Sequence, residues 1–248
     1  MISLFKLKHG TTGENRNSFI TFSKVPHPRK YNTTESLTKV STEGEINFPL
    51  VFPDFRFSDE NTHWADYMIC HSIQPFFMIL SNHLKEIIIQ SKVAYWDSYP
   101  IKIDNSYYNE YASDINFGVA SNIIGGQERR IYNAFRLRYT RVEEYINWQK
   151  TIWEVYEFDN VTFKKYNEKI VMVENEIDLK EKRGYYNQQK KVFKLKELVL
   201  KKDIEFDDLF RFPIAFGYDF IISEYLKNTM ENYNISGVNF EKVESIEY

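Results

Sequence analysis

Several side chains of the types that can bind metal ions lie between residues 63 and 83. The group consists of His63, Asp66, Cys70, His71 and His83. Structural zinc sites usually present ligands in closely spaced pairs, such as two cysteines two to four residues apart, and that spacing is absent here. Adjacent residues such as Cys70 and His71 also point to opposite faces of a strand. We therefore expect a buried cysteine and scattered polar histidines, with no metal and no cofactor.

Two serines, Ser81 and Ser223, each stand between an apolar run and a helical pattern. A nucleophilic serine in a strand–turn–helix elbow occupies the same place, but it is flanked by glycines that allow the tight turn. Those glycines are absent here. A serine hydroxyl can instead accept a backbone N–H from the first turn of a helix. We interpret both serines as helix caps and predict no catalytic residue.

Neighbouring carboxylates provide a second possible chemistry. They occur as Glu143 with Glu144 and as Glu174 with Glu176, within charged stretches. Only burial would raise the pKa of such a group enough for acid–base catalysis, and we expect these glutamates to be solvated. An enzyme of unrecognised type, with acids or histidines assembled only by the fold, remains an alternative.

Five arginines lie between residues 129 and 141 and alternate with aromatic residues. They are Arg129, Arg130, Arg136, Arg138 and Arg141, with Tyr132, Phe135 and Tyr139 among them. This stretch could form a basic strip with stacking platforms for a nucleic acid. However, the formal net charge of the chain is -3, whereas such proteins are usually strongly basic. We expect Phe135, Leu137 and Tyr139 to face the core, and Arg136 and Arg138 to face the opposite way, toward acids in 174–181.

The elements that would position these residues include a pattern that occurs twice, 142 residues apart. Residues 78–85 match residues 220–227, each as an apolar run, a serine and an amphipathic helix. Alternating apolar residues follow each helix, which is typical of a strand. We align Val93 and Tyr95 with Val238 and Phe240, an offset of 145 that implies about three extra loop residues in the second copy. The copies could be two related corners of one sheet.

Further periodic segments indicate more strands than helices. We predict strands at 4–8, 19–22, 67–70, 135–139, 152–158 and 192–200, a short helix at 142–148, a solvated helix or loop at 174–190, and turns at 125–126 and 206–210. The fold class is therefore α+β: a strand-rich mixed or antiparallel sheet with a few amphipathic helices, including two strand–Ser–helix–strand units. We divide the chain into an N-terminal strand and loop segment, 1–60, and a main α+β domain, 61–248. The two parts could also form one continuous domain.

Composition limits the cellular setting. Hydrophobic residues make up 43% of the chain and aromatic residues 17%. Enriched tyrosine and tryptophan can mark a binding surface, although a compositional bias toward Ile, Lys, Asn, Tyr and Phe explains most of them. Cys70 is the single cysteine, so no disulfide can form within the chain. No apolar run is long enough to cross a bilayer, and we expect a cytoplasmic protein without membrane contacts.

The closing stretch, Phe220–Asn228 followed by 235–243, resembles the C-terminal signature of predicted immunity proteins of bacterial polymorphic toxin systems. The similar families are those numbered eleven and forty-three, the first of them also catalogued as a domain of unknown function. Their earlier Ser-x-x-Leu helix would correspond to 81–84, and segments 142–148 and 152–155 resemble their middle part. Asn147 stands where the family often has aspartate.

The resemblance covers roughly residues 66–248 and implies a non-catalytic protein that binds and neutralises a cognate toxin domain. It names no partner-binding residue, and it defines neither the toxin nor the oligomeric state. A nucleic-acid-binding module that uses Arg129–Arg141 remains a further alternative.

Overall fold

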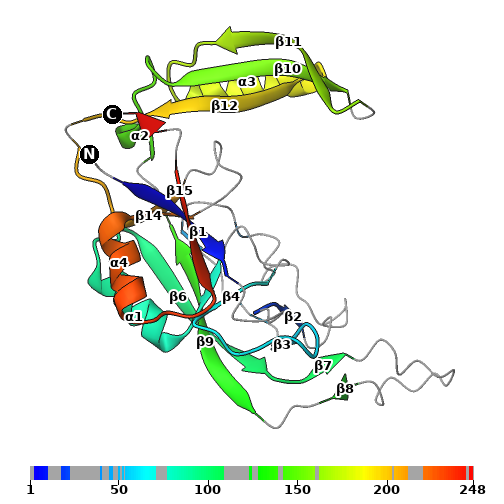
Figure 1. The fold of residues 1–248 in the computed structure, drawn as a ribbon, viewed down its shortest axis with the longest axis vertical. Helices are drawn as coiled ribbons and strands as arrows, with labels where there is room; N and C mark the ends of the chain where they lie inside the picture. Colours follow the sequence, from blue (N-terminus) through cyan, green and yellow to red (C-terminus); the bar gives the residue numbers. More distant parts are fainter. Residues whose placement is uncertain are drawn as a thin grey trace, which may run out of the picture.

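A computed structural model describes most of the chain, and it is strand-rich with a few helices (Figure 1). The described residues are 3–10, 18–22, 40, 45–46, 50, 52, 54–70, 77–108, 123–124, 128–138, 142–159, 162–202, 204–211, 220–243 and 246–247. The predicted α+β class is confirmed: the sheets are mainly antiparallel, with parallel pairing of β3 (Phe55–Phe57) with β6 (Trp96–Asp104) and of β12 (Val192–Val199) with β16 (Ile246–Glu247).

The repeated sequence pattern corresponds to two repeated structural units. In the first unit, β4 (Tyr67–Met68) pairs with β5 (Met78–Leu80), and α1 (Asn82–Gln90) follows. In the second, β13 (Leu209–Arg211) pairs with β14 (Phe220–Ser223), and α4 (Glu224–Asn232) follows. Tyr67 pairs with Leu80, and Leu209 pairs with Ile222. Both members of the second pair stand 142 positions after their counterparts, so strand register as well as sequence is repeated.

Each unit contains two further strands. Strand β9 (Arg129–Leu137) lies between β5 and β6 (Trp96–Asp104) in the first unit. Strand β1 (Leu4–His9) lies between β14 and β15 (Val238–Lys242) in the second. The unit that closes the chain is therefore completed by a strand from its beginning.

Register confirms that β9 and β1 are equivalent. Phe135 of β9 lies between Met78 and Ser98, and Leu7 of β1 lies between Phe220 and Phe240. Phe220 and Phe240 again stand 142 positions after Met78 and Ser98.

These pairings correct the predicted alignment downstream of the helices. Val238 is equivalent to Trp96, not to Val93, and the offset stays at 142 without an insertion. The residue before each strand has a left-handed backbone, with φ of 53° at Tyr95 and 77° at Gly237. Because a left-handed residue interrupts an extended strand, Tyr95 belongs to the turn. The units also lie in two different sheets, not at two corners of one sheet.

The two units share one hydrophobic core. It includes Leu84 and Ile88 of α1, Leu226 and Met230 of α4, and Phe135. Ser, Leu and the following apolar positions recur at helical spacing, which gives each helix a single buried stripe. Figure 1 shows α1 and α4 next to each other beside the strands, and the two helices are in contact.

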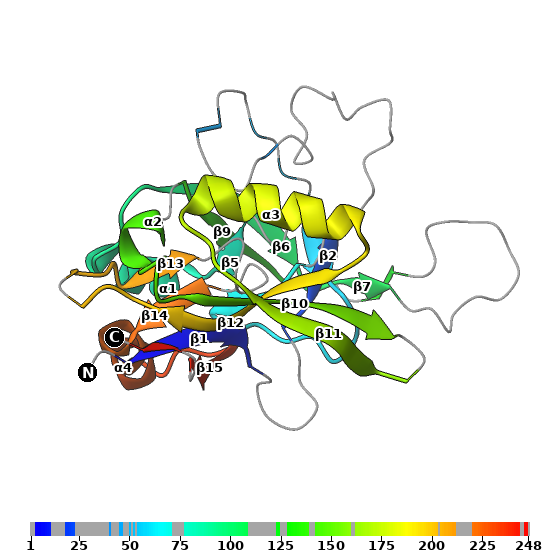
Figure 2. The same cartoon turned by 90° about the horizontal axis from the view of Figure 1, so that it is seen from above.

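A third sheet forms what we call the outer module, at the top of Figure 1. Its strand order is β11-β10-β12-β16, and α3 lies across one face (Figure 2). The bounds are β10 Ile152–Asp159, β11 Lys164–Val171, α3 Glu176–Gln188, β12 Val192–Val199 and β16 Ile246–Glu247. Trp153 and Leu195 of this module share a core with Leu4, Phe210 and Ile221 of the second unit.

The remaining elements are short. They are β2 (Ile20–Phe22), β3 (Phe55–Phe57), β7 (Tyr107–Tyr108), β8 (Ile123–Ile124) and α2 (Val142–Tyr145). The six-stranded sheet has the order β2-β3-β6-β9-β5-β4, so segment 1–60 contributes strands to both repeated units' sheets.

Several predicted boundaries are wrong. Part of the predicted turn 206–210 belongs to strand β13, and the strand predicted at 135–139 is the end of β9, which starts at Arg129. Strand β11 was not predicted, because its sequence KKYNEKIV lacks a continuous apolar face. The turn predicted at 125–126 lies outside the described residues. Among the described helices, none is long and apolar enough to span a membrane.

Candidate functional site

Each predicted capping serine forms the same pair of hydrogen bonds. Ser81 Oγ accepts the Leu84 N–H at 3.1 Å and donates to Asp66 Oδ1 at 2.7 Å. Ser223 Oγ accepts the Leu226 N–H at 3.1 Å and donates to an aspartate, Asp208, at 2.5 Å. The interpretation of both serines as helix caps is confirmed. Each hydroxyl proton is directed at a carboxylate that fixes the start of a helix.

Both aspartates also bind the segment that follows the helix of the other unit. The Asp66 Oδ2 atom accepts the Ser236 N–H at 3.0 Å and the Ser236 hydroxyl at 2.7 Å. Asp208 Oδ2 accepts the Lys92 N–H at 2.9 Å. Ser236 follows α4 and Lys92 follows α1, so the contacts are reciprocal. We call Asp66, Ser81, Asp208 and Ser223 the Asp–Ser locks, and we assign them a structural role.

The electrostatic environment of Asp66 favours its ionised form. Burial by itself would raise the pKa of the Asp66 carboxyl, but hydrogen bonds from Ser81 and Ser236 and the nearby His83 outweigh this effect. The net result is a pKa below the usual value for aspartate. His83 Nδ1 lies 3.9 Å from Asp66 Oδ1, which is too long for a hydrogen bond.

Of the side chains considered as metal ligands, Asp66 and His83 lie near each other. Within the described part of the chain, no three His, Cys, Asp or Glu side chains are placed to hold a metal ion. Cys70 is buried in the core with Met68 and Phe77. His83 packs its ring against Tyr233, at 5.8 Å between centroids. His71 lies outside the described residues.

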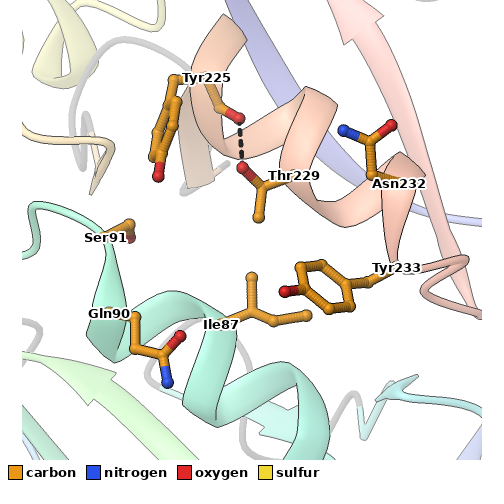
Figure 3. A pocket seen from close by; sticks show the side chains of 7 residues that line it. All are labelled: Ile87, Gln90, Ser91, Tyr225, Thr229, Asn232 and Tyr233. Atoms are coloured by element: carbon orange, nitrogen blue, oxygen red, sulfur yellow. Dashed lines mark hydrogen bonds between the residues drawn. The ribbon is translucent and has the colours of Figure 1, made fainter.

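A groove between α1 and α4 contains a cavity of about 280 Å³ (Figure 3). It is lined by Ile87, Gln90, Ser91, Tyr225, Thr229, Asn232 and Tyr233. The α1 residues at 87, 90 and 91 correspond to the α4 residues at 229, 232 and 233 by the offset of 142. The groove therefore lies where the two repeated units meet, and its walls are equivalent surfaces with different side chains.

The strand pair β10–β11 carries an exposed aromatic cluster, which we call the hairpin cluster. It consists of Tyr156, Phe158 and Phe163. Phe158 lies 6.5 Å from Tyr156 and 6.4 Å from Phe163, between ring centroids. Phe163 is 77% exposed, whereas Tyr156 is buried.

Below the hairpin cluster, a buried carboxylate is neutralised by a lysine. Lys165 Nζ lies 3.0 Å from Glu154 Oε1 and 4.4 Å from the centroid of the Tyr156 ring. The hydrogen bond with Glu154 raises the pKa of Lys165. Each of the two charges therefore has an opposite charge beside it next to the Tyr156 ring.

The predicted basic strip is interrupted by acids. Arg136 is fully buried and lies 3.5 Å from Asp97, which also lies 3.4 Å from Arg138. The acids that these arginines meet are therefore Asp97 and, for Arg138, Glu45, not those of 174–181. The prediction failed because β9 pairs with β6, which brings Asp97 directly opposite Arg136.

The other arginines of this stretch also have acidic neighbours. Arg130 forms a 2.6 Å ion pair with Glu128 and covers the ring of Trp64, and Arg129 lies 3.4 Å from Asp104. The hydrogen bond from Arg130 lowers the pKa of Glu128, and that from Trp64 adds to it. Arg141 and Tyr139 lie outside the described residues, while Phe135 and Leu137 are buried as predicted.

The candidate acid pairs are surface groups where they are described. Glu174 is exposed, and Glu176 forms an ion pair of 2.6 Å with Lys180 on α3. Glu144 is likewise exposed, and nothing is described of the Glu143 side chain. These positions agree with the solvated helix surface that the sequence suggests.

Comparison with models of known protein families and with curated protein sequences finds no significant match for this chain. Its function must therefore be argued from its own surfaces.

The sequence contains an overlooked signal for the Asp–Ser locks. Asp208 stands 142 positions after Asp66, as Ser223 does after Ser81. Extending the repeat upstream by twelve residues, from 78 to 66 and from 220 to 208, would have revealed both aspartates. The hairpin cluster and the groove have no such signal, because exposure depends on how strands and helices pack.

Proposed function

We propose that this chain is a non-catalytic, immunity-type protein that binds a cognate bacterial toxin domain and thereby neutralises it. The observation that carries the proposal is the distribution of exposed large hydrophobic side chains. Among the described residues there are eleven of these, and seven lie in the outer module or directly beside it. The seven are Phe158, Phe163, Tyr166, Ile170, Met172, Ile177 and Tyr185.

Concentration of such side chains on one module favours a protein partner. Fully burying a Phe, Leu or Ile side chain contributes about 1.5–3 kcal/mol, so a few of these residues could supply most of an interface. Phe163 is the strongest candidate for an anchor, because it is 77% exposed and already contacts Phe158. Large exposed apolar groups of this kind usually mark an interaction surface.

Side-chain contacts fit this surface better than addition of a partner strand. Strand β11 is the edge of its sheet, and it carries lysines at 164, 165 and 169. Asn167 has a left-handed φ of 53°, and the register with β10 shifts between Val155 and Glu157. Lysines and bulges on an edge strand both discourage strand pairing. A toxin would therefore meet the rings of the hairpin cluster rather than the backbone of β11.

Blocking a toxin requires only tight binding at or near its active site or an essential moving part. An exposed aromatic side chain such as Phe163 is of the kind that anchors protein interfaces. The resemblance of residues 66–248 to predicted immunity proteins supports the same class of function.

The proposal is tested by recovering the tagged protein from its native cells and identifying bound proteins by mass spectrometry. We expect a stoichiometric partner that carries a toxin domain. Phe163→Ala should reduce the recovered partner at least about tenfold, because an interface anchor typically contributes 2 kcal/mol or more. The melting temperature should remain unchanged, since the Phe163 side chain is mostly in water.

Ile131→Ala is the matched control, because Ile131 is 58% exposed but belongs to β9. It should retain the partner. Equal loss in both variants would contradict the hairpin cluster as the contact surface. Failure of the purified protein to associate with the toxin domain encoded beside it would overturn the proposed function.

A further inference from the structure

The groove between α1 and α4 has different side chains at its two equivalent ends. At one end, the ring of His83 on α1 meets the ring of Tyr233 after α4, at 5.8 Å between centroids and nearly edge to face. By the offset of 142, His83 of the first unit corresponds to Tyr225 of the second, and Ser91 of the first unit corresponds to Tyr233 of the second. At the other end, Tyr225 therefore faces a serine where the repeat would place a second ring.

Figure 3 shows Tyr225 and Ser91 on opposite sides of the open part of the groove. A serine side chain is several atoms shorter than a tyrosine, so the ring contact of the first end has no counterpart. Ser91 Oγ is instead directed back to its own helix, where it donates to the Ile88 carbonyl at 2.6 Å. The cavity of about 280 Å³ lies beside this position. The second end of the groove therefore lacks one of the two rings that pack together at the first end.

The cavity walls define what could fill that place. Among the lining residues none is charged, and the polar groups are hydroxyls and the amides of Gln90 and Asn232. Tyr225 is 64% exposed, so its ring face is available to a bound ring. Cavities that hold drug-sized ligands or cofactors usually range from about 300 to 1,000 Å³. The volume here lies just below that range and is large enough for one aromatic side chain.

We infer that this cavity binds the side chain of a tyrosine supplied by a polypeptide partner. The ring packs edge to face against Tyr225, as Tyr233 packs against His83, and such pairs contribute about 0.5–1.5 kcal/mol beyond the area buried. The cavity walls supply hydroxyl and amide groups that can both donate hydrogen bonds to the phenolic hydroxyl and accept hydrogen bonds from it. The inference rests on the proposed function for the source of the tyrosine, namely the toxin, but the cavity can be tested alone.

The first experiment uses p-cresol, which has the side-chain atoms of tyrosine, and follows backbone amide shifts by NMR. We expect saturable shifts at Ile87, Gln90, Ser91 and Asn232, with a dissociation constant in the roughly millimolar range. Ser91→Tyr restores the missing ring and should weaken p-cresol binding at least about tenfold. Tyr225→Ala removes the ring against which the bound ring packs and should weaken p-cresol binding about threefold to tenfold.

Glu181→Tyr is the matched control, because it adds a tyrosine on the exposed surface of α3. Its affinity for p-cresol should equal that of the unaltered protein. Absence of saturable shifts at the groove would overturn the inference, as would unaltered p-cresol affinity in Ser91→Tyr. If Ser91→Tyr fails to fold, the exposed position of Tyr225 makes Tyr225→Ala the deciding variant.

The two proposals fail in different ways. If p-cresol binds and no toxin is recovered, the cavity is supported and the proposed function is overturned. If a toxin is recovered and p-cresol does not bind, the proposed function is supported and the tyrosine-binding cavity is overturned. With a recovered toxin in hand, Ser91→Tyr should reduce its retention while Glu181→Tyr does not.

Discussion

At the scale of single residues, Asp66 joins the start of α1 to a segment 170 positions further along the chain. Its carboxylate accepts hydrogen bonds from Ser81 at the start of α1 and from Ser236 after α4. An aspartate with several donors is stabilised as the anion, since each donor favours the charged form. The lowered pKa of Asp66 therefore reflects hydrogen bonds from Ser81 of its own unit and from Ser236 of the other unit.

This gives a prediction for the dependence of stability on pH. The folded-state pKa of Asp66 lies below its unfolded value, so its contribution is present above about pH 4 and is lost as pH falls through the folded-state pKa. Asp66→Asn should reduce the free energy of unfolding by about 1–3 kcal/mol at pH 7. That difference from the unaltered protein should shrink below about pH 4. Urea denaturation between pH 2.5 and 7 measures it.

Glu60→Gln provides the comparison, because it removes one exposed carboxylate. Its effect should stay within about 0.5 kcal/mol at pH 7. A constant difference between Asp66→Asn and the unaltered protein across the whole pH range would contradict the role assigned to the charge.

At the scale of elements, the two units form the same turn with different residues. Tyr95 and Gly237 are equivalent, and both have a left-handed backbone before a strand. Their carbonyls accept equivalent hydrogen bonds, from the Arg138 N–H at 2.6 Å and the Gly10 N–H at 3.0 Å. Only the second site is crowded: a Cβ on Gly237 would lie 2.3 Å from the Tyr67 carbonyl oxygen. The same turn therefore accepts a side chain in one unit and excludes it in the other.

Gly237→Ala should consequently destabilise the protein by about 2–4 kcal/mol, from backbone strain and a clash with Tyr67. Tyr95→Ala should cost less than about 1 kcal/mol, because its side chain is 57% exposed and a Cβ is already accommodated there. Thermal unfolding of both variants measures the difference. Similar losses of stability in the two variants would show that the two turns do not differ in this way.

At the scale of the whole molecule, strand β1 closes the second unit. Lys6 pairs with Ile221 of β14 on one side and with Glu241 of β15 on the other. The chain thus joins its first described strand to its last 40 residues, and the first unit obtains the equivalent strand, β9, from the residues that follow β6. Because β1 is central in its sheet, we expect the second unit to depend on it for folding.

Lys6→Pro tests this dependence. A proline in a strand paired on both sides removes a ladder hydrogen bond and should destabilise the protein by about 3 kcal/mol or more. We expect amide-exchange protection to fall together in β14, α4 and β15. Lys6→Ala is the control, because it keeps the backbone N–H of residue 6 and shortens only a partly exposed side chain, and it should cost less than about 1 kcal/mol. Persistent protection of α4 in Lys6→Pro would show that the second unit is stable without β1.

The sequence by itself determined the features that depend on neighbouring residues. The α+β class, the helices after Ser81 and Ser223, and their buried stripes follow from capping and periodicity, which act within one or two turns. The repeat of residues 78–85 at 220–227 was visible in the sequence because it is also made of neighbouring residues. Strand β11 was missed because local alternation is weak in an exposed edge strand, whose stability comes from β10.

Only the tertiary structure decided which distant residues meet. Pairing of β9 with β6 placed Asp97 against Arg136, and pairing of β1 with β14 and β15 completed the second unit. The groove with Ser91 and Tyr225 exists because α1 and α4 pack together, and the hairpin cluster is exposed because nothing described covers that part of the outer module. Such contacts depend on packing between residues that are far apart in the sequence. No local periodicity of the side chains predicts that packing.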